Sequence, residues 1–288
     1  MIRGLYTAAA GMIAEQRRHD TVTNNVANLN TPGYKGVNSV NRAFPEMLIS
    51  LMGSPDDTKG TIGKLNTGVF AEESLINLGQ GDLNETGRSQ DLALVSDILV
   101  DGQAFDDSGK FVDANGTVTY QPQALFTVQN PDGERRYTRD GGFRTTADGT
   151  LVTPDGMQVL GVDGQAIRVD GTWDNVQVTA DGRLIDKETQ QPLAGNPALL
   201  LTEVNDPNQL IRQGDGKYVY QGDANGLRQV QAGERVEIKQ GYLERSNVDA
   251  SQSMVDLMSA LRAYEANQKI VQYYDRSLDK AVNDVGRV

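Results

Sequence analysis

The stretch DGERRYTRDGGFRTTADGTLVTPDGMQVLGVDGQAIRVDG, residues 132–171, decides the fold of the middle of this chain. The pair Asp-Gly returns in it every seven or eight residues, starting at positions 132, 140, 148, 155, 163 and 170. Short alternating segments, such as 158–160 and 166–169, lie between the pairs. Asp-Gly suits type I′ hairpin turns, because both central residues of that turn need a positive φ. The spacing therefore predicts a meander of short antiparallel strands.

Both ends of the chain carry apolar residues at helical spacing instead. Residues 3–29 and 251–285 contain no proline, and the segment 246–249 offers N-cap residues for the second stretch. Each stripe predicts an amphipathic helix that seeks a partner. We expect the assembly interface to consist of Leu5, Met12, Val22, Val26 and Leu29 at one end, and Met254, Leu257, Leu261, Tyr264, Val271 and Leu278 at the other. The alternative is that both helices simply pack on the middle domain.

These patterns predict a mixed, mainly β fold, in which an antiparallel β domain of short hairpins is flanked by N- and C-terminal α-helices of coiled-coil type. The predicted parts are an N-terminal helix over 1–32, an extended linker over 33–66, a glycine-rich β domain over 67–245 and a C-terminal helix over 246–288. The segments 1–32 and 251–288 together would form one helical domain.

The residue inventory excludes several kinds of catalytic site. The chain has no cysteine and one histidine, His19, so disulfides, thiol nucleophiles, His-based triads and multi-His metal sites within one chain are excluded. No phosphate-binding loop ending in GK[ST] and no G-x-S-x-G elbow occurs. The segment 113–116 does not fit a calcium loop, because its glycine stands at the fourth position. We therefore expect no catalytic, cofactor-binding or metal-binding residue. Catalysis by two carboxylates stays open, although nothing singles out a pair among 39 acidic residues.

The charge argues against nucleic-acid and membrane partners. The formal net charge is −12, and the acidity is concentrated in the middle of the chain, between residues 51 and 240. Phosphates repel such a surface, so neither nucleic acid nor an anionic membrane is an expected partner. No apolar run reaches the roughly 18 residues that a membrane helix requires. A secretory signal peptide is not expected either, because no apolar stretch with a cleavage site follows Arg3.

The ends also carry recognisable motifs. Residues 24–35 form an N-terminal motif that, like the opening segment 4–12, resembles a signature of bacterial flagellar basal-body rod and hook proteins. Segments 246–249 and 262–269 resemble the C-terminal signature of the same family, and 80–83, 91–94 and 137–143 are similar to its middle. The residues of the N-terminal motif are Asn24, Asn25, Val26, Ala27, Asn28, Leu29, Asn30, Thr31, Pro32, Gly33, Tyr34 and Lys35.

The resemblance implies a structural subunit of the flagellar basal body, most like a distal rod protein. Such a subunit is exported by the flagellar type III apparatus, and its partners are copies of itself and other axial proteins of the rod and hook. Its terminal helices would interlock with those of neighbouring subunits to form a tube. A hook or rod–hook junction subunit is the alternative, and rod is favoured because the chain has room for one modest β domain.

One segment departs from the family pattern. About thirty residues, roughly 95–123, intervene before the pattern resumes at 125–128, and we expect an additional hairpin there. Two remote alternatives stay open for the whole chain. A cell-wall-acting enzyme would need a catalytic domain that the sequence does not show. An acidic β adhesin would leave the heptad stripes at both ends unexplained.

Overall fold

The computed structural model describes residues 2–50, 61–72, 74–98, 100, 103–106, 109–169, 171–214, 216–231 and 234–285. The chain divides into two compact units. Unit 1 contains residues 1–27, 37–75 and 249–288, and unit 2 contains residues 28–36 and 76–248. Both ends of the polypeptide therefore belong to unit 1, and the middle of the chain forms most of unit 2.

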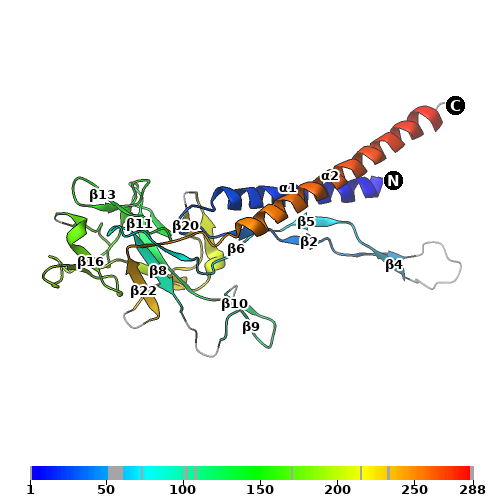
Figure 1. The fold of residues 1–288 in the computed structure, drawn as a ribbon. Helices are drawn as coiled ribbons and strands as arrows, with labels where there is room; N and C mark the ends of the chain where they lie inside the picture. The colour runs from blue at the N-terminus through cyan, green and yellow to red at the C-terminus, as the bar shows by residue number, and fades with distance from the viewer. Residues whose placement is uncertain are drawn as a thin grey trace. The chain divides into compact units, whose positions relative to one another are not determined.

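Unit 1 is built on two long helices, α1 (Ile2–Ala27) and α2 (Ala250–Lys280), which pack side by side in opposite directions (Figure 1). A π-helical turn, Ala281–Val285, follows α2. The carboxylate of Asp249 caps α2, because its Oδ1 accepts hydrogen bonds from the backbone N of Ser251 (2.7 Å) and Gln252 (3.0 Å). Asp249 lies within the segment 246–249, which was predicted to provide the N-cap.

The segment between the helices in unit 1 forms two antiparallel strand pairs. β2 pairs with β5, and β3 pairs with β4; β5 also packs against α1. The segment 33–66, predicted as an extended linker, contains strands β1 to β4, while residues 51–60 lie outside the described residues. The strands of this part of the chain are β1 (Val37–Asn38), β2 (Asn41–Ala43), β3 (Met47–Ser50), β4 (Thr61–Leu65), β5 (Val69–Ala71) and, at the boundary of the units, β6 (Leu75–Ile76).

The main sheet of unit 2 has nine strands in the described part of the chain, and β11 lies at its centre. β11 pairs antiparallel with β12, β15 and β18. The strands are β11 (Gln123–Gln129), β12 (Arg135–Thr138), β13 (Arg144–Thr145), β14 (Leu151–Val152), β15 (Gln158–Val159), β18 (Leu201–Val204), β19 (Leu210–Arg212), β20 (Lys217–Tyr220) and β21 (Leu227–Gln229).

Among its described residues, unit 2 also has four antiparallel pairs and three short 3₁₀ turns. The pairs are β7 (Leu83–Glu85) with β23 (Tyr242–Glu244), β8 (Leu92–Ser96) with β22 (Val236–Gln240), β9 (Lys110–Val112) with β10 (Val118–Tyr120), and β16 (Val176–Val178) with β17 (Leu184–Asp186). The 3₁₀ turns are Trp173–Asn175, Pro207–Gln209 and Ala224–Gly226.

The core of unit 2 lies on both faces of β11. Phe126 faces the larger cluster, where its ring meets that of Phe143 edge-on at 5.2 Å. Leu125 faces a smaller cluster with Tyr137 and Tyr218 on the other side. β11 carries apolar residues on both faces, which is typical of a strand buried on both sides: Ala124, Phe126 and Val128 belong to the larger cluster and Leu125 to the smaller. Two clusters around one strand explain why this short segment is the centre of the sheet.

The repeated Asp-Gly pairs do form turns, but the predicted type I′ geometry is wrong. In the turns at 133, 149, 156, 164 and 182, the glycine has a positive φ and its N donates to the carbonyl three residues earlier. The preceding aspartates do not have a positive φ; among described non-glycine residues only Gln190 and Asn196 do. This is the three-residue loop in which a type I turn is followed by a left-handed glycine. The aspartate therefore occupies a position of the type I turn that has a negative φ, and only the glycine adopts the left-handed conformation.

The insertion at 95–123 contains the hairpin β9–β10. Asp113 closes its turn, because the Oδ1 atom accepts hydrogen bonds from the N of Asn115 (2.9 Å) and Thr117 (2.8 Å). The Asp-Gly pair at 101–102, in the same insertion, lies outside the described residues. The prediction of terminal helices flanking many short antiparallel strands is confirmed.

Candidate assembly interface

The two helices of unit 1 approach closely at heptad intervals. A Cβ added at Gly4 would lie 2.1 Å from Tyr274 Oη, and one at Gly11 would lie 3.0 Å from Asn267 Nδ2. One heptad further along, Arg18 Nη2 lies 3.0 Å from Asp256 Oδ1. The glycines on α1 thus leave room for Tyr274 and Asn267 of α2, and Arg18 and Asp256 form an ion pair between the two helices. The α1 positions are seven apart, whereas on α2 the interval is seven from Tyr274 to Asn267 and eleven from Asn267 to Asp256.

The predicted seam residues fall on two different sides of the helices. Val22 is buried, and Leu5, Met12, Val26 and Leu29 are half-buried, with Leu29 beyond the end of α1. On α2, one heptad series faces inward and is half-buried, whereas Met254 and Leu261 are 56% and 47% exposed. The half-buried series consists of Leu257, Tyr264, Val271 and Leu278.

The outward side of the helix pair is unusually apolar. Met258, which is 53% exposed, lies one turn from Met254 and one turn from Leu261, so the three form a stripe along α2. On α1, Tyr6 and Ile13 are exposed one heptad apart. Exposed stripes of this kind, as distinct from scattered single residues, mark interaction surfaces.

The N-terminal family motif is divided between the two units. Asn25 belongs to unit 1, where its amide exchanges two hydrogen bonds with the backbone of Val37, 2.8 Å to the carbonyl O and 3.0 Å from the N. The second half of the motif belongs to unit 2 and begins at Asn28. There Gly33 has φ +64°, and a Cβ at this position would lie 2.5 Å from the backbone N of Asp140. The glycine is required both for its conformation and for this close approach.

Behind Gly33 lies a buried ion cluster, formed by Lys35, Arg139 and Glu244, which we call the Glu244 cluster. One carboxylate oxygen of Glu244 accepts from Lys35 Nζ at 2.6 Å and from Gly81 N at 2.8 Å. The other accepts from Arg139 Nε at 2.6 Å. None of the three side chains is more than 2% exposed. The cluster joins the motif after α1 to the strand that precedes α2 in the sequence.

The remaining donors of the cluster are also satisfied. Lys35 Nζ donates to the carbonyl O of Gly79 at 2.8 Å. The guanidinium of Arg139 donates to the carbonyl O of Ala124 (2.6 Å) and of Leu94 (2.9 Å), and to Gln80 Oε1 (2.7 Å). These hydrogen bonds allow three charges to stay out of water, because an unpaired buried charge is very costly.

The protonation of the cluster reflects burial and charge together. Burial lowers the pKa of Lys35 to about 8, and Arg139 acts in the same direction, against the attraction of Glu244. Burial raises the pKa of Glu244, but Arg139 and Lys35 outweigh that effect and hold the pKa below its usual range. At neutral pH the cluster therefore has two cations on one carboxylate.

Two more side chains attach the motif to unit 2. The side chain of Asn247 accepts from Gly36 N at 2.7 Å and donates to the carbonyl O of Asn77 at 2.8 Å. Arg212 lies over the Tyr34 ring, with 4.2 Å between its Cζ and the ring centroid, and donates to the carbonyl O of Lys35 at 2.5 Å. The segment that follows α1 and the segment that precedes α2 are thus held at one place within unit 2.

The sequence reasoning missed the Glu244 cluster, although the signal was present. Lys35 closes the N-terminal motif, Arg139 lies within the segment 137–143, and Glu244 stands two residues before Ser246. Each residue of the Glu244 cluster thus lies within, or next to, a motif that resembles the family. Periodicity could not reveal that these three charges meet, because they lie 105 and 209 positions apart.

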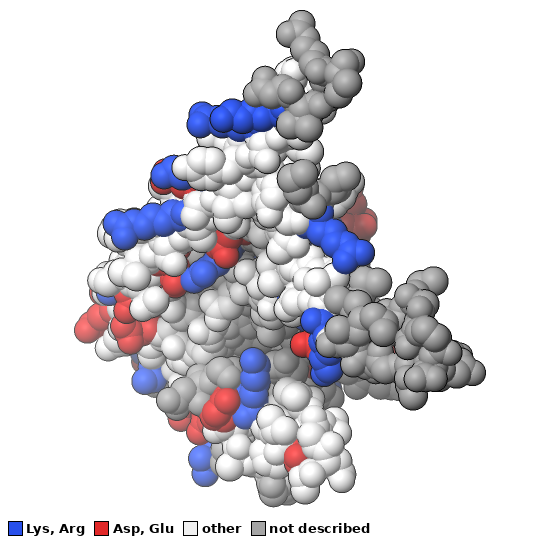
Figure 2. All heavy atoms as spheres, turned by 90° about the vertical axis from the view of Figure 1, so that its right-hand side faces the viewer, with Lys and Arg blue, Asp and Glu red and all other residues white. Residues whose placement is uncertain are grey.

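Other kinds of site find little support. In the described residues no group of three or more His, Cys, Asp or Glu side chains could hold a metal ion. No described helix is long and apolar enough to cross a bilayer. On the face drawn in Figure 2, Lys and Arg side chains are scattered among uncharged and acidic ones and form no single basic patch.

Comparison with known proteins identifies the family. Three family models match: "Flagella basal body rod protein" over residues 5–35, "Flagellar hook protein FlgE/F/G D1 domain" over 121–185, and "Flagellar basal body rod FlgEFG protein C-terminal" over 239–284. The chain is 36% identical over 293 residues to the flagellar hook-basal body complex protein FlhO of Bacillus subtilis, with 100% of both chains covered. The chain belongs to the flagellar basal-body rod and hook protein family.

Other members of the flagellar rod and hook family match over almost the same length. The flagellar basal-body rod protein FlgG of Agrobacterium fabrum is 30% identical, with 95% of this chain and 96% of the relative covered. FlgG of Bacillus subtilis is 27% identical, with 98% and 99% covered. The resemblance predicted from the terminal motifs is therefore confirmed, and so is the location in the hook–basal body complex of the flagellum.

Proposed function

We propose that this protein is a structural subunit of the flagellar basal-body rod, assembled through its terminal helices. The observation that carries the proposal is the apolar stripe of Met254, Met258 and Leu261 on α2, within a segment that matches the rod-protein C-terminal model. Burying a Met or Leu side chain stabilises by about 1.5–3 kcal/mol relative to full exposure. A stripe of three therefore favours association over the free monomer.

Association would extend the helix pair into a coiled-coil-type tube. The heptad contacts of Gly4 and Gly11 with α2 support this geometry, because they set a register of seven within one subunit. The outward stripe of α2, together with Tyr6 and Ile13 on α1, is left for neighbouring subunits. The eleven predicted seam residues would then serve two contacts, one inside each subunit and one between subunits.

The Glu244 cluster would serve assembly indirectly, as a fixed anchor. It holds the motif that follows α1 against the strand that precedes α2, through hydrogen bonds of 2.6 Å on both carboxylate oxygens. A subunit in a tube must transmit torque through such connecting segments, so a rigid, fully paired cluster suits them better than a flexible linker. The mechanism is assembly without turnover, with no catalytic residue, cofactor or metal.

Export through the flagellar type III apparatus is part of the proposal. A chain without cysteine can pass unfolded through a channel with no disulfide to reduce. Its partners are copies of itself and other axial proteins of the rod and hook. Relatives named as rod proteins favour the rod over the hook, and the single β-rich unit of modest size agrees with them.

The test is a substitution on the outward stripe. Leu261→Asp should abolish rods in a strain whose own copy is deleted, because it places a charge in the buried contact between helices. Ser259→Asp is the matched control, since Ser259 is exposed on the same helix outside the stripe. Electron microscopy of extracted basal bodies gives the readout. Normal rods that contain Leu261→Asp would contradict the assignment of the stripe.

The deletion strain itself separates the alternatives. Short or missing rods support a rod subunit, whereas complete rods with absent or deformed hooks assign the protein to the hook or the rod–hook junction. Intact filaments on normal basal bodies would refute an axial role. A zone of clearing when the purified protein is run in a peptidoglycan gel would favour a cell-wall-acting enzyme instead.

A further inference from the structure

The exposed apolar residues of α1 point away from α2 of the same chain. Gly4 and Gly11 face α2, because side chains of α2 lie against them. Tyr6 and Ile13 each follow one of these glycines by two residues, which is a rotation of about 200° around the helix axis. They therefore lie on the far side of α1, where they are 70% and 55% exposed. We call this pair the α1 stripe.

The outward stripe of α2, formed by Met254, Met258 and Leu261, is also exposed in its own molecule. From its first residue to its last it advances by seven positions, as the α1 stripe does. Because the α1 stripe faces away from α2, the two stripes of one molecule cannot meet. Two apolar stripes of equal length are thus available for contact between molecules.

Each stripe is followed by a charged residue, and the two charges are opposite. Arg3 lies one turn before Tyr6 on α1, and Glu265 lies one turn after Leu261 on α2. Both charged residues are exposed. Neither forms an ion pair with another residue of the described ranges. The ends of the two stripes are therefore complementary in charge as well as in apolar character.

The direction of packing follows from the symmetry of an array. α1 and α2 run in opposite directions within one molecule. If α1 packs antiparallel on α2 of the next copy, that copy points the same way as the first, and repetition gives a ring or an open helical array. Parallel packing would reverse every second copy, and it would bring Glu265 beside Arg17, one turn after Ile13. A tube whose subunits all point one way requires the antiparallel arrangement.

We propose that the α1 stripe of one copy packs antiparallel on the outward stripe of α2 in the next copy. Tyr6 then lies beside Leu261, and Arg3 lies beside Glu265. Burial of the two stripes favours association, and the ion pair at their edge fixes the register. This inference rests on the proposed function, and it names the surface of the neighbouring copy that the stripe of α2 contacts.

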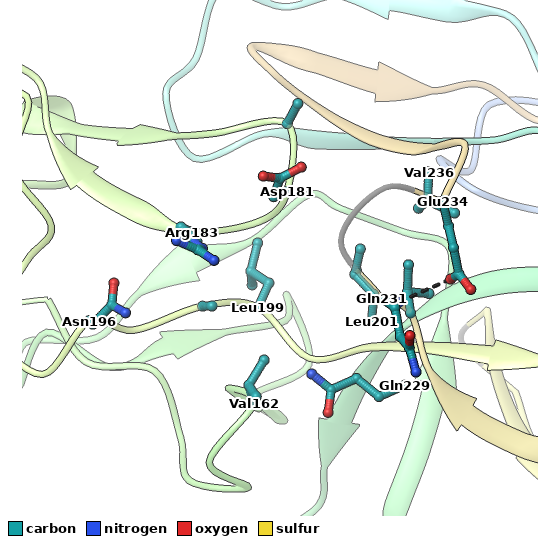
Figure 3. A pocket seen from close by; sticks show the side chains of 13 residues that line it. Val162, Asp181, Arg183, Asn196, Leu199, Leu201, Gln229, Gln231, Glu234 and Val236 are labelled. Carbon is teal, nitrogen blue, oxygen red and sulfur yellow. Dashed lines mark hydrogen bonds between the residues drawn. The ribbon is translucent and has the colours of Figure 1, made fainter.

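The hollow of unit 2 around Leu199 is a poor alternative partner for the α1 stripe (Figure 3). Leu199, Leu201 and Val236 line the hollow, but all three are buried. Glu234 is already paired with Arg228, with 2.5 Å between Glu234 Oε1 and Arg228 Nη1. The accessible lining is mainly polar, so the hollow offers little apolar surface to Tyr6.

Site-directed cross-linking tests the docking, and the cysteine-free chain gives a clean background. In the full-length double variant Tyr6→Cys/Leu261→Cys, the two thiols lie side by side between antiparallel copies. The matched control is Tyr6→Cys/Met254→Cys, whose second thiol lies seven residues, or about 10 Å, further along α2. That exceeds the Cβ–Cβ distance of about 4 Å in a disulfide. After oxidation of extracted basal bodies, we expect linked subunits with the first variant and none with the control.

The outcomes separate the two proposals. Normal rods that contain the Tyr6→Cys/Leu261→Cys chain but yield no linked subunits would overturn the docking and leave the rod assignment intact. Linked subunits with the control alone, or equally with both variants, would overturn the antiparallel packing. A disulfide within a single chain of the first variant would show that the stripes meet in one molecule, which also overturns the proposal. Absence of the wild-type chain from basal bodies would overturn the rod assignment and the docking with it.

An exchange of charges tests the register without thiols. Glu265→Arg should reduce the number of rods, because it places two cations together at the end of the stripes, and Arg3→Glu/Glu265→Arg should restore that number. The matched control is Arg17→Glu/Glu265→Arg, which should restore nothing. All three residues are exposed, so the melting temperature of the monomer should stay unchanged. Rods of normal number with Glu265→Arg, or rescue by Arg17→Glu in place of Arg3→Glu, would refute the docking.

Discussion

Replacing Glu244 by Gln is the sharpest test of the Glu244 cluster. The substitution keeps the size of the side chain and removes one negative charge. It leaves the ammonium of Lys35 and the guanidinium of Arg139 buried beside a neutral amide. One amide oxygen cannot replace two carboxylate oxygens, so an amide NH₂ must point at a donor, whichever way the side chain is turned.

The size of the effect follows from the contacts. Glu244 is fully buried and accepts from Lys35, Arg139 and Gly81. Removing one partner from a buried ion pair costs about 3–5 kcal/mol, because the remaining charge is uncompensated. For a domain of 150–250 residues, each kcal/mol lowers the melting temperature by roughly 2–4 °C, so we expect a fall of roughly 6–20 °C.

The assay is thermal unfolding of the full-length monomer, followed by circular dichroism in the β region. Glu237→Gln is the matched control, since Glu237 is an exposed residue on β22 and its substitution should change stability by less than about 0.5 kcal/mol. The double variant Lys35→Met/Glu244→Gln should recover part of the loss, because it removes one of the unpaired cations. A melting temperature of Glu244→Gln equal to that of the control would refute the reasoning.

Three further predictions concern acid stability, a glycine and a helix cap. The pKa of Glu244 in the folded protein is lowered from 4.5, so its contribution to the free energy of unfolding is present above pH 4.5 and is lost as the pH falls below that value. In this acid range, the melting temperature of the wild type should fall more steeply than that of Glu244→Gln. Parallel acid profiles of the two proteins would contradict this prediction. Gly33→Ala should lower the free energy of unfolding in urea by roughly 2–5 kcal/mol, from the strain of a left-handed alanine and from the clash of its Cβ with the backbone of Asp140. Gly87→Ala, with φ +68° and open space around the Cβ, should show the strain alone. Equal losses in the two variants would exclude the clash. Asp249→Ala should lower the stability of α2 by about 1 kcal/mol, measured as earlier loss of helical circular dichroism on heating, and Asp275→Ala, on the exposed side of α2, should not.

The elements of the fold were predictable where local sequence dictates them. The heptad stripes predicted both terminal helices, and 246–249 predicted the cap that Asp249 provides. The Asp-Gly spacing predicted the turns, but it could not predict their type. Type I′ and type I with a following left-handed glycine both accept Asp-Gly, and they differ in the φ of the aspartate, which composition does not determine.

The arrangement of the site was less accessible to sequence reasoning. Heptad notation placed Met254 and Leu257 on one seam, whereas in the structure Leu257 is half-buried and Met254 is exposed. The Glu244 cluster depends on contacts between segments that are far apart in the chain. No periodicity carries such contacts, and only the charged residues in the motifs pointed to them.

The pairing of α1 with α2 also requires that both ends of the chain are present in the same molecule. Arg18 and Asp256 are 238 positions apart, and Lys35 and Glu244 are 209 apart. Closing a loop of that length costs about 5 kcal/mol of chain entropy plus a constant, and the cost is met only when both ends are present. In a polypeptide that emerges with its N-terminus first, β5 follows α1 early, but the helical partner α2 follows only with the last forty residues. A chain that ends before residue 244 can close neither contact, so it lacks the helix pair of unit 1 altogether.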